Sequence, residues 1–274
     1  FLWWQSATKG EALLPLRLFG DRNFSLANSA IAAVGLTVTS QSLPLVFYYQ
    51  LVLGFSPTRA ALQLVPMAVV SGSLAPLAGH LVDRVHPRIL ATFGLVVMAG
   101  TLFWYSAWMV PDEALWWRLL FPSALMGVAG AFTYGPLSTT ATYNLPVADA
   151  GAGAGVYNSV RQVGAVLGSA AIAALMESQL ATHLPGGAAA GEAAEATGRL
   201  PAVLQAGFAQ AMANSLVLPA GVALLAAGFT LFFAARQARA PWTAANLHPG
   251  QPGSAPGALG LEPSNASADS EVPR

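Results

Sequence analysis

The chain has 274 residues, of which 55% are hydrophobic and only 9% charged, and its mean hydropathy is +0.55. This charged fraction lies far below the ~25% of an ordinary soluble domain, which excludes a soluble globular protein. With a formal net charge of zero, no cysteine and four scattered histidines, the sequence offers no basic field for nucleic acid, no disulfide framework and no metal-ligand spacing.

Residues 1–23 are predicted to form a cytoplasmic loop that follows the end of a truncated membrane helix. The opening Phe1-Leu-Trp-Trp4 is too short for the apolar region of a signal peptide, and its tryptophans suit a membrane interface. We therefore interpret the sequence as a fragment that lacks its preceding helices.

Six apolar stretches predict membrane-spanning helices, because about 20 mostly apolar residues cover the roughly 30 Å hydrocarbon layer. They run from about residues 26 to 53, 60 to 82, 89 to 110, 115 to 143, 152 to 176 and 209 to 235. These continuous runs do not alternate as the strands of a membrane barrel do. The predicted fold is an all-α integral membrane bundle of six transmembrane helices within residues 24–239.

The predicted connections are short and contain turn residues, which favours antiparallel neighbouring helices in one bundle. The exception is the segment 177–201, which is rich in Gly and Ala and is predicted to be a polar loop. Residues 240–274 are rich in Pro, Gly, Ser and Ala without periodicity, so a disordered cytoplasmic tail is expected there.

The distribution of basic residues predicts the orientation of the bundle. Placing the loops alternately on the two sides puts nine Lys and Arg residues on one face and three on the other, the latter being Arg59, Arg118 and Arg199. By the positive-inside rule the first face is cytoplasmic, so both ends of the fragment are expected on the cytoplasmic side of the membrane.

Glycines and prolines within the spans predict close helix packing and kinked helices. Gly164 and Gly168 have the GxxxG spacing that lets two helix backbones approach each other in lipid. Packing within the bundle is favoured over dimerisation. The residues assigned to helix packing are Gly127, Gly130, Pro136, Gly155, Gly164 and Gly168.

Polar side chains within the spans are candidates for the wall of a substrate cavity. In the first two spans these are Gln41, Gln50 and Gln63, with the aromatic neighbours Tyr48 and Tyr49. In the fifth span Asn158, Arg161 and Gln162 share a helix face, since they lie at i, i+3 and i+4. Arg161 has two open interpretations, as an anchor at the membrane interface or as a cavity residue.

Two motifs resemble a known family. The residues between the second and third spans resemble the G-x-L-x-D-R-x-G-R-[KR] loop of the major facilitator superfamily: Gly79, Leu81, Asp83, Arg84 and Arg88 match, whereas His86 and Pro87 depart from it. Residues 151–168 are similar to the G-x-x-x-G-x-x-N-x-x-R-Q-x-G-x-x-x-G pattern in the penultimate helix of fourteen-helix drug:proton antiporters of the EmrB/QacA type. Residues 15–24 also resemble the cytoplasmic segment before the ninth helix of those proteins.

This resemblance implies the C-terminal bundle of a major facilitator transporter, made of two inverted three-helix repeats. The implied function is proton-coupled efflux of drugs and other amphipathic small molecules by alternating access, with the proton gradient as energy source and no cofactor. The implied partners are the lipid bilayer, the missing N-terminal half and the substrate, and a periplasmic adaptor protein is left open. No Asp or Glu lies in the middle of a predicted span, so the carboxylate that carries the proton is expected mainly in the missing half.

Other functions fit the sequence less well. A membrane enzyme would need a catalytic acid, a histidine pair or a metal cluster near one membrane face, and the sequence contains no such group. A non-catalytic six-helix scaffold or channel subunit stays open, as does a facilitator-superfamily transporter of a metabolite rather than of drugs.

Overall fold

The computed structural model describes residues 16–112, 117–142, 145, 149–184 and 199–233, and the regular elements within these ranges are helices. The greater part of the predicted N-terminal loop and the whole predicted tail at 240–274 lie outside the described residues. A 3₁₀ turn, η1 (Leu16–Gly20), occupies the end of that loop.

The first long helix, α2 (Arg22–Phe47), begins at Asp21 because its side-chain Oδ1 accepts a hydrogen bond from the Phe24 N–H at 2.7 Å. It continues into a π-helical turn, η2 (Tyr48–Val52), and the combined segment has 31 residues. The chain then reverses at Gly54, whose φ of +66° favours glycine.

The second apolar segment, predicted as one span from about residue 60 to 82, is divided into two helices just before Pro66, which lacks a backbone N–H. A short helix, α3 (Pro57–Leu62), is followed after Gln63 and Leu64 by α4 (Val65–Arg84). The Oγ of Ser123 donates a hydrogen bond to the carbonyl oxygen of Gln63 at 2.7 Å. A side chain from a neighbouring helix thus satisfies a carbonyl at the break, as membrane helices require.

The remaining helices are α5 (Pro87–Trp108), α6 (Leu120–Thr142), α7 (Ala150–His183), α9 (Ala202–Ser215) and α10 (Val217–Leu231). The prediction of a polar loop beginning at residue 177 is wrong for Glu177–His183, since α7 continues through these residues. The last helical segment also begins at Ala202 rather than near residue 209. Side-chain hydrogen bonds explain the longer α7: Asn214 on α9 donates to Oε1 of Gln179 at 3.1 Å, and its Nδ2 lies 3.0 Å from Nε2 of His183.

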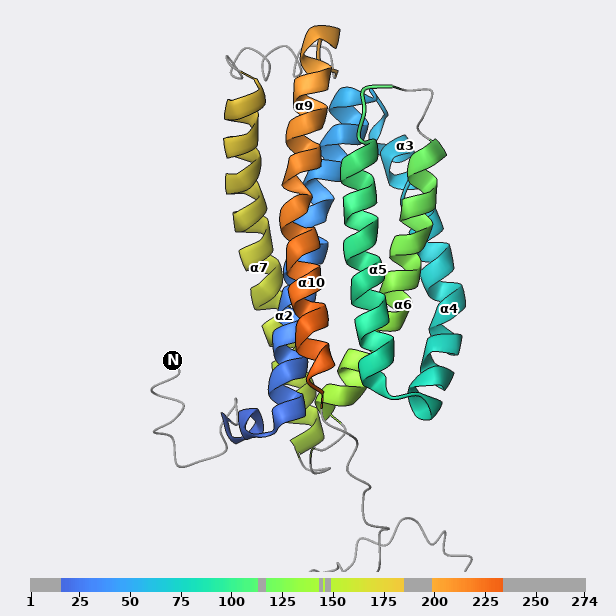
Figure 1. Cartoon of the computed structure of the whole chain (residues 1–274), viewed down its shortest axis with the longest axis vertical. Helices are drawn as coiled ribbons and strands as arrows, with labels where there is room; N and C mark the ends of the chain where they lie inside the picture. Colours follow the sequence, from blue (N-terminus) through green and yellow to red (C-terminus); the bar gives the residue numbers. More distant parts are fainter. Residues whose placement is uncertain (1–15, 113–116, 143–144, 146–148, 185–198, 234–274) are drawn as a thin grey trace, which may run out of the picture. The chain divides into compact units, whose positions relative to one another are not determined.

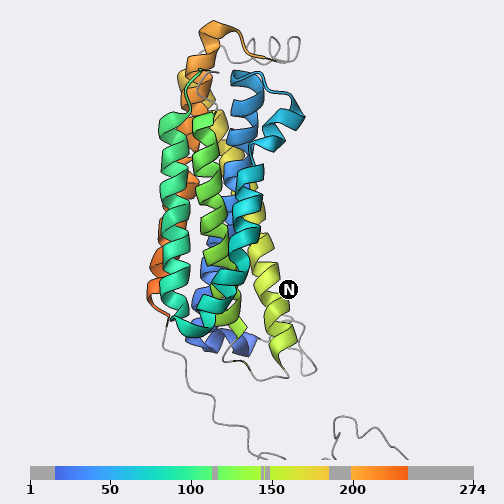
Figure 2. The same cartoon turned by 90° about the vertical axis from the view of Figure 1, so that its right-hand side faces the viewer.

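Five segments of the described chain are long and apolar enough to cross a membrane. They are Arg22–Val52, Pro57–Arg84, Pro87–Trp108, Ala150–His183 and Ala202–Leu231. Helix α6 is not among them, because it contains many Gly, Ser, Thr and Pro residues. It nevertheless packs between α4 and α5 in the same bundle (Figures 1 and 2).

The helices form a bundle in which α2 packs against α7 and α10, and α5 packs against α6 and α10. Figure 1 shows the start of α2, the α4–α5 turn and the end of α10 at one end of this bundle, here named the α4–α5 end. The α2–α3 connection, the end of α7 and the start of α9 lie at the opposite end, named the α2–α3 end. The largest buried cluster lies toward the α2–α3 end and includes Tyr48, Leu102 and Met212.

Candidate functional site

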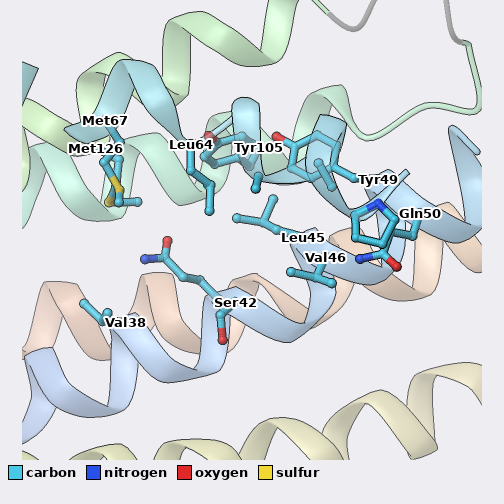
Figure 3. A pocket seen from close by; sticks show the side chains of 14 residues that line it. Val38, Ser42, Leu45, Val46, Tyr49, Gln50, Leu64, Met67, Tyr105 and Met126 are labelled. Carbon is cyan, nitrogen blue, oxygen red and sulfur yellow. The ribbon is translucent and has the colours of Figure 1, made fainter. Parts of the chain in front are cut away.

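Two adjoining cavities lie in the part of the bundle that α2, α4 and α6 enclose. The Tyr49 cavity has a volume of about 290 Å³ and is lined by Val38, Gln41, Ser42, Leu45, Val46, Tyr49, Gln50, Pro57, Ala60, Ala61, Leu64, Met67, Tyr105 and Met126. Leu64 and Met67 lie across from Val38 in this cavity (Figure 3). The Tyr134 cavity has about 270 Å³ and is lined by Val38, Gln41, Met67, Ala68, Ser71, Gly72, Met98, Met126, Gly130 and Tyr134.

The helix irregularities described above supply part of the Tyr49 cavity wall. Tyr49 and Gln50 belong to the π-helical turn η2, and π turns often occur at functional sites. Leu64 belongs to the break between α3 and α4. The wall therefore combines rigid helix surface with two segments that lack α-helical hydrogen bonding.

The chemistry of the wall is apolar and aromatic, with a few neutral polar groups. Among the described residues that line either cavity, none is Asp, Glu, Lys, Arg or His. Met67, Met126, Tyr49 and Tyr105 contribute to the wall of the Tyr49 cavity, and sulfur and aromatic surfaces suit flat apolar ligands. Such a wall is typical of a site for small, largely apolar molecules.

Among the described residues that line both cavities, Gln41 is the polar one. Its side chain is 8% exposed, and its Oε1 accepts no hydrogen bond from any described residue. By contrast, the neighbouring Ser42 Oγ donates to the carbonyl oxygen of Thr39 in its own helix at 2.7 Å. A buried acceptor of this kind requires a donor that the described residues do not supply. In the Tyr49 cavity the Tyr49 hydroxyl oxygen is also buried, beside Tyr105.

Of the other candidates in the first two spans, Gln50 lines the Tyr49 cavity, whereas Tyr48 and Gln63 line neither cavity. The Tyr48 side chain is 1% exposed, and its hydroxyl donates to the carbonyl oxygen of Val110 at 2.6 Å. Gln63 is buried at the α3–α4 break. Tyr49, which was also a candidate, does line the Tyr49 cavity. The methionines and Tyr105 were not anticipated, because no sequence pattern distinguishes them from core residues.

The three candidates of the fifth span lie on α7 and line neither cavity. Asn158 is exposed, and its Nδ2 donates to the carbonyl oxygen of Ala154 at 3.0 Å. Gln162 is also exposed, whereas Arg161 is half-buried. Arg161 interacts electrostatically with Tyr134, a residue of the Tyr134 cavity, and with Tyr157.

The loop that resembles a family motif forms the turn between α4 and α5. Asp83, Arg84 and Arg88 are exposed, and a Cβ at Gly79 would meet no atom within 4 Å. His86 caps α5, since its Nδ1 accepts from the Arg88 N–H at 3.3 Å. This loop lies at the α4–α5 end (Figure 1), and none of its residues lines the Tyr49 cavity.

The glycines assigned to helix packing fall into two groups. A Cβ at Gly164 would collide with the Ala32 backbone, one at Gly168 would lie 2.5 Å from the Leu36 carbonyl oxygen, and one at Gly127 would lie 2.5 Å from the Met67 carbonyl oxygen. A Cβ at Gly130 would be 3.6 Å from Ser71 Oγ, and one at Gly155 would meet no atom within 4 Å. Pro136 is buried within α6. Helix α7 thus approaches α2 closely at Gly164 and Gly168, but not at Gly155.

Comparison with known proteins identifies the family. The profile described as Major Facilitator Superfamily matches residues 4–169, which is more than half of the chain. The chain belongs to the major facilitator superfamily. Members of this superfamily are membrane transporters rather than enzymes, and they need no cofactor. Within the described part of this MFS chain, no group of three or more His, Asp or Glu residues is placed to hold a metal ion.

Relatives of this MFS chain include proteins named for the export of antibiotics or resistance to them. The chain is 45% identical over 237 residues to the uncharacterized MFS-type transporter Rv1250 of Mycobacterium tuberculosis, covering 85% of this chain and 41% of the relative. It is 33% identical over 165 residues to the cephamycin export protein CmcT of Amycolatopsis lactamdurans, covering 58% of this chain and 33% of the relative. It is 26% identical over 217 residues to the lincomycin resistance protein LmrB of Listeria monocytogenes, covering 78% of this chain and 44% of the relative. The chain therefore spans less than half of the length of each of these relatives.

Proposed function

We propose that this chain is the C-terminal half of a proton-coupled exporter that moves amphipathic small molecules, including antibiotics, out of a bacterial cell by alternating access. The observation that carries the proposal is the pair of apolar, uncharged cavities that share Gln41 on a helical scaffold of this superfamily. The relatives named for cephamycin export and lincomycin resistance support the same substrate class.

The uneven burial of the helices supports the proposal that another half of the polypeptide packs against this bundle. Only 11% of the most apolar stretch of α3–α4 and 22% of that of α7 are buried, against 50–56% in the other three apolar segments. Asn158 and Gln162 are exposed on one face of α7, and a carboxamide that faces hydrocarbon is unfavourable. In the proposal, the rest of the polypeptide covers this side of α4 and α7 and completes the cavity.

The positions of the acidic residues support the proposal that the other half supplies the carboxylate for proton coupling. The acidic residues among those described are Asp21, Asp83, Asp112, Asp149 and Glu177, and all lie outside the helices or near helix ends. A carboxylate that binds and releases protons within the membrane is therefore proposed to come from the preceding segments.

In the proposed arrangement α6 is a sixth span. The segments α2, α3–α4 and α5 then form one three-helix repeat, and α6, α7 and α9–α10 form its inverted counterpart. The α4–α5 end lies in the cytoplasm, where Arg84 and Arg88 obey the positive-inside rule. Export across a second membrane would require a periplasmic adaptor protein as a further partner.

Efflux of a fluorescent amphipathic dye tests the proposed function. Pump-deficient bacteria that produce the complete polypeptide should extrude the dye, and collapse of the proton gradient with a protonophore should stop the efflux. Bacteria that produce residues 1–274 alone should retain the dye at the level of cells without the protein. Efflux by the 274-residue chain alone, or efflux that survives the protonophore, would contradict the proposal.

A further inference from the structure

The Gln41 carboxamide occupies the boundary between the two cavities. It lines both of them, its side chain is 8% exposed, and its Oε1 has no donor among the described residues. The neighbouring space of about 290 Å³ and 270 Å³ is ample for an aromatic ligand beside this amide. The Gln41 side chain therefore borders both cavities with an acceptor oxygen that no described residue uses.

The surroundings of Gln41 restrict the charge of the ligand. None of the described lining residues is ionised at neutral pH, so a charged group bound against this wall would lose water without gaining a counter-ion. Tyr49, Tyr105, Met67 and Met126 instead present aromatic and thioether surface to the cavity. An uncharged aromatic or apolar body fits this wall.

The chemistry of a carboxamide restricts the polar group of the ligand. A carboxamide carries a donor and an acceptor side by side in one plane, and its closest complement is a second amide that presents both in the reverse order. This complementarity holds for either assignment of the oxygen and nitrogen of Gln41, because exchanging them only turns the ligand over. An ester or lactone of the same shape lacks the donor.

We propose that Gln41 recognises neutral amides, such as lactams and carboxamides carried on an aromatic or apolar body, and that this wall prefers them to the corresponding esters. The proposal rests on the proposed export function and specifies the substrate class for it.

Two matched probes test the proposal: the lactam dihydrocarbostyril and the lactone dihydrocoumarin, which differ by an N–H in place of an oxygen. Their dissociation constants are measured by equilibrium dialysis against the protein in lipid nanodiscs, with empty nanodiscs as the blank. The lactam should bind roughly three- to tenfold more tightly than the lactone, as expected for one net hydrogen bond. In Gln41→Leu this ratio should fall to about one, chiefly by loss of lactam binding.

Thr39→Val is the matched control, since the Thr39 Oγ1 donates within its own helix to the Gly35 carbonyl oxygen at 3.0 Å and lines neither cavity. It should keep the wild-type ratio. Gln41→Met, which keeps the length of the side chain, replaces Gln41→Leu if the latter does not fold. Equal binding of the two probes by the wild type, no binding of either probe, or a preference that survives removal of the amide would each overturn the proposal. Intact dye export without a lactam preference overturns this inference alone, whereas a lactam preference without export overturns the proposed function alone.

Discussion

The Oγ of Ser40 on α2 donates a hydrogen bond to the carbonyl oxygen of Gly168 on α7, at 3.0 Å. The bond is possible because a glycine at position 168 lets the two helix backbones approach, and a Cβ there would lie 2.5 Å from the Leu36 carbonyl oxygen. In lipid, where apolar burial does not drive helices together, such close packing with an interhelical hydrogen bond is a principal source of association.

Gly164→Ala should destabilise the bundle. The added methyl group would collide with the backbone of Ala32, which cannot move aside as a flexible side chain can, so we expect a loss of about 1–3 kcal/mol. Unfolding in mixed detergent, followed by circular dichroism, measures this loss.

Gly155→Ala is the matched control on the same helix. Its methyl group would meet no atom within 4 Å, and alanine favours the helix over glycine, so the variant should be as stable as the wild type or up to about 1 kcal/mol more stable. An equal loss in the free energy of unfolding for Gly164→Ala and Gly155→Ala would contradict the close contact of α7 with α2 at Gly164.

Ser123→Ala should weaken the α3–α4 break. It removes the hydroxyl that donates to the Gln63 carbonyl oxygen, and we expect a loss of about 0.6–2 kcal/mol in the free energy of unfolding. Ser73→Ala, at an exposed position whose Oγ donates to Val70 in its own helix, should change stability by less than about 0.5 kcal/mol. The same unfolding measurement applies, and two equal effects would contradict the role of Ser123.

Single cysteines in this cysteine-free chain test the proposed orientation. Ser56→Cys, at the α2–α3 end, should react with a membrane-impermeant maleimide in intact cells. His86→Cys, at the α4–α5 end, should react only after the membrane is permeabilised. Labelling of His86→Cys in intact cells would contradict the proposed orientation and place the α4–α5 end outside the cell.

Arg161→Gln should impair efflux by the complete transporter roughly tenfold, a change of about 1.4 kcal/mol, while expression stays near normal. The half-buried Arg161 interacts electrostatically with Tyr134 and Tyr157, and it lies on a helix that the proposal places against the rest of the polypeptide. Arg161→Lys should restore efflux only in part, because an ammonium group does not reproduce the planar array of donors.

Arg118→Gln is the comparison for Arg161. The guanidinium of Arg118 lies 4.9 Å from the ring centroid of Trp108 and 5.4 Å from that of Trp117, in an aromatic cluster remote from α7. Its substitution should leave efflux per molecule unchanged. If Arg161→Gln behaves in the same way, Arg161 is an interface anchor and not part of the transport machinery.

Hydropathy predicted where most helices lie, because a run of apolar residues long enough for lipid leaves few alternatives. Pro66, in the first turn of α4, predicted a kink beside the break at Gln63 and Leu64, because proline lacks the backbone N–H. Hydropathy did not predict that the segment divides into two helices there or that Ser123 donates to the Gln63 carbonyl oxygen, since Ser123 lies on a distant segment. The helical end of α7 was also missed, because the bonds of Gln179 and His183 to Asn214 join positions far apart in sequence.

The candidate site shows the same limit. Gln41 could be singled out because a carboxamide within an apolar span is conspicuous, but the choice between Tyr48 and Tyr49 could not be made. A pattern that assumes 3.6 residues per turn assigns side chains to faces, and the π-helical turn at Tyr48–Val52 changes that assignment. Which glycines of α7 contact α2 likewise depends on where the two helices cross, and the spacing of the glycines in the sequence does not predict that position.

The turn η2 is connected to two other segments at the α2–α3 end. The Tyr48 hydroxyl donates to Val110, just beyond α5, and the Leu51 carbonyl accepts from the N–H of Leu200, just before α9, at 2.9 Å. Tyr49 and Gln50, between these two attachment points, line the Tyr49 cavity. A displacement of this turn would therefore also move the chain next to α5 and the chain next to α9. A ligand that displaces the cavity wall would thus act on the ends of three helices, α2, α5 and α9, through one five-residue turn.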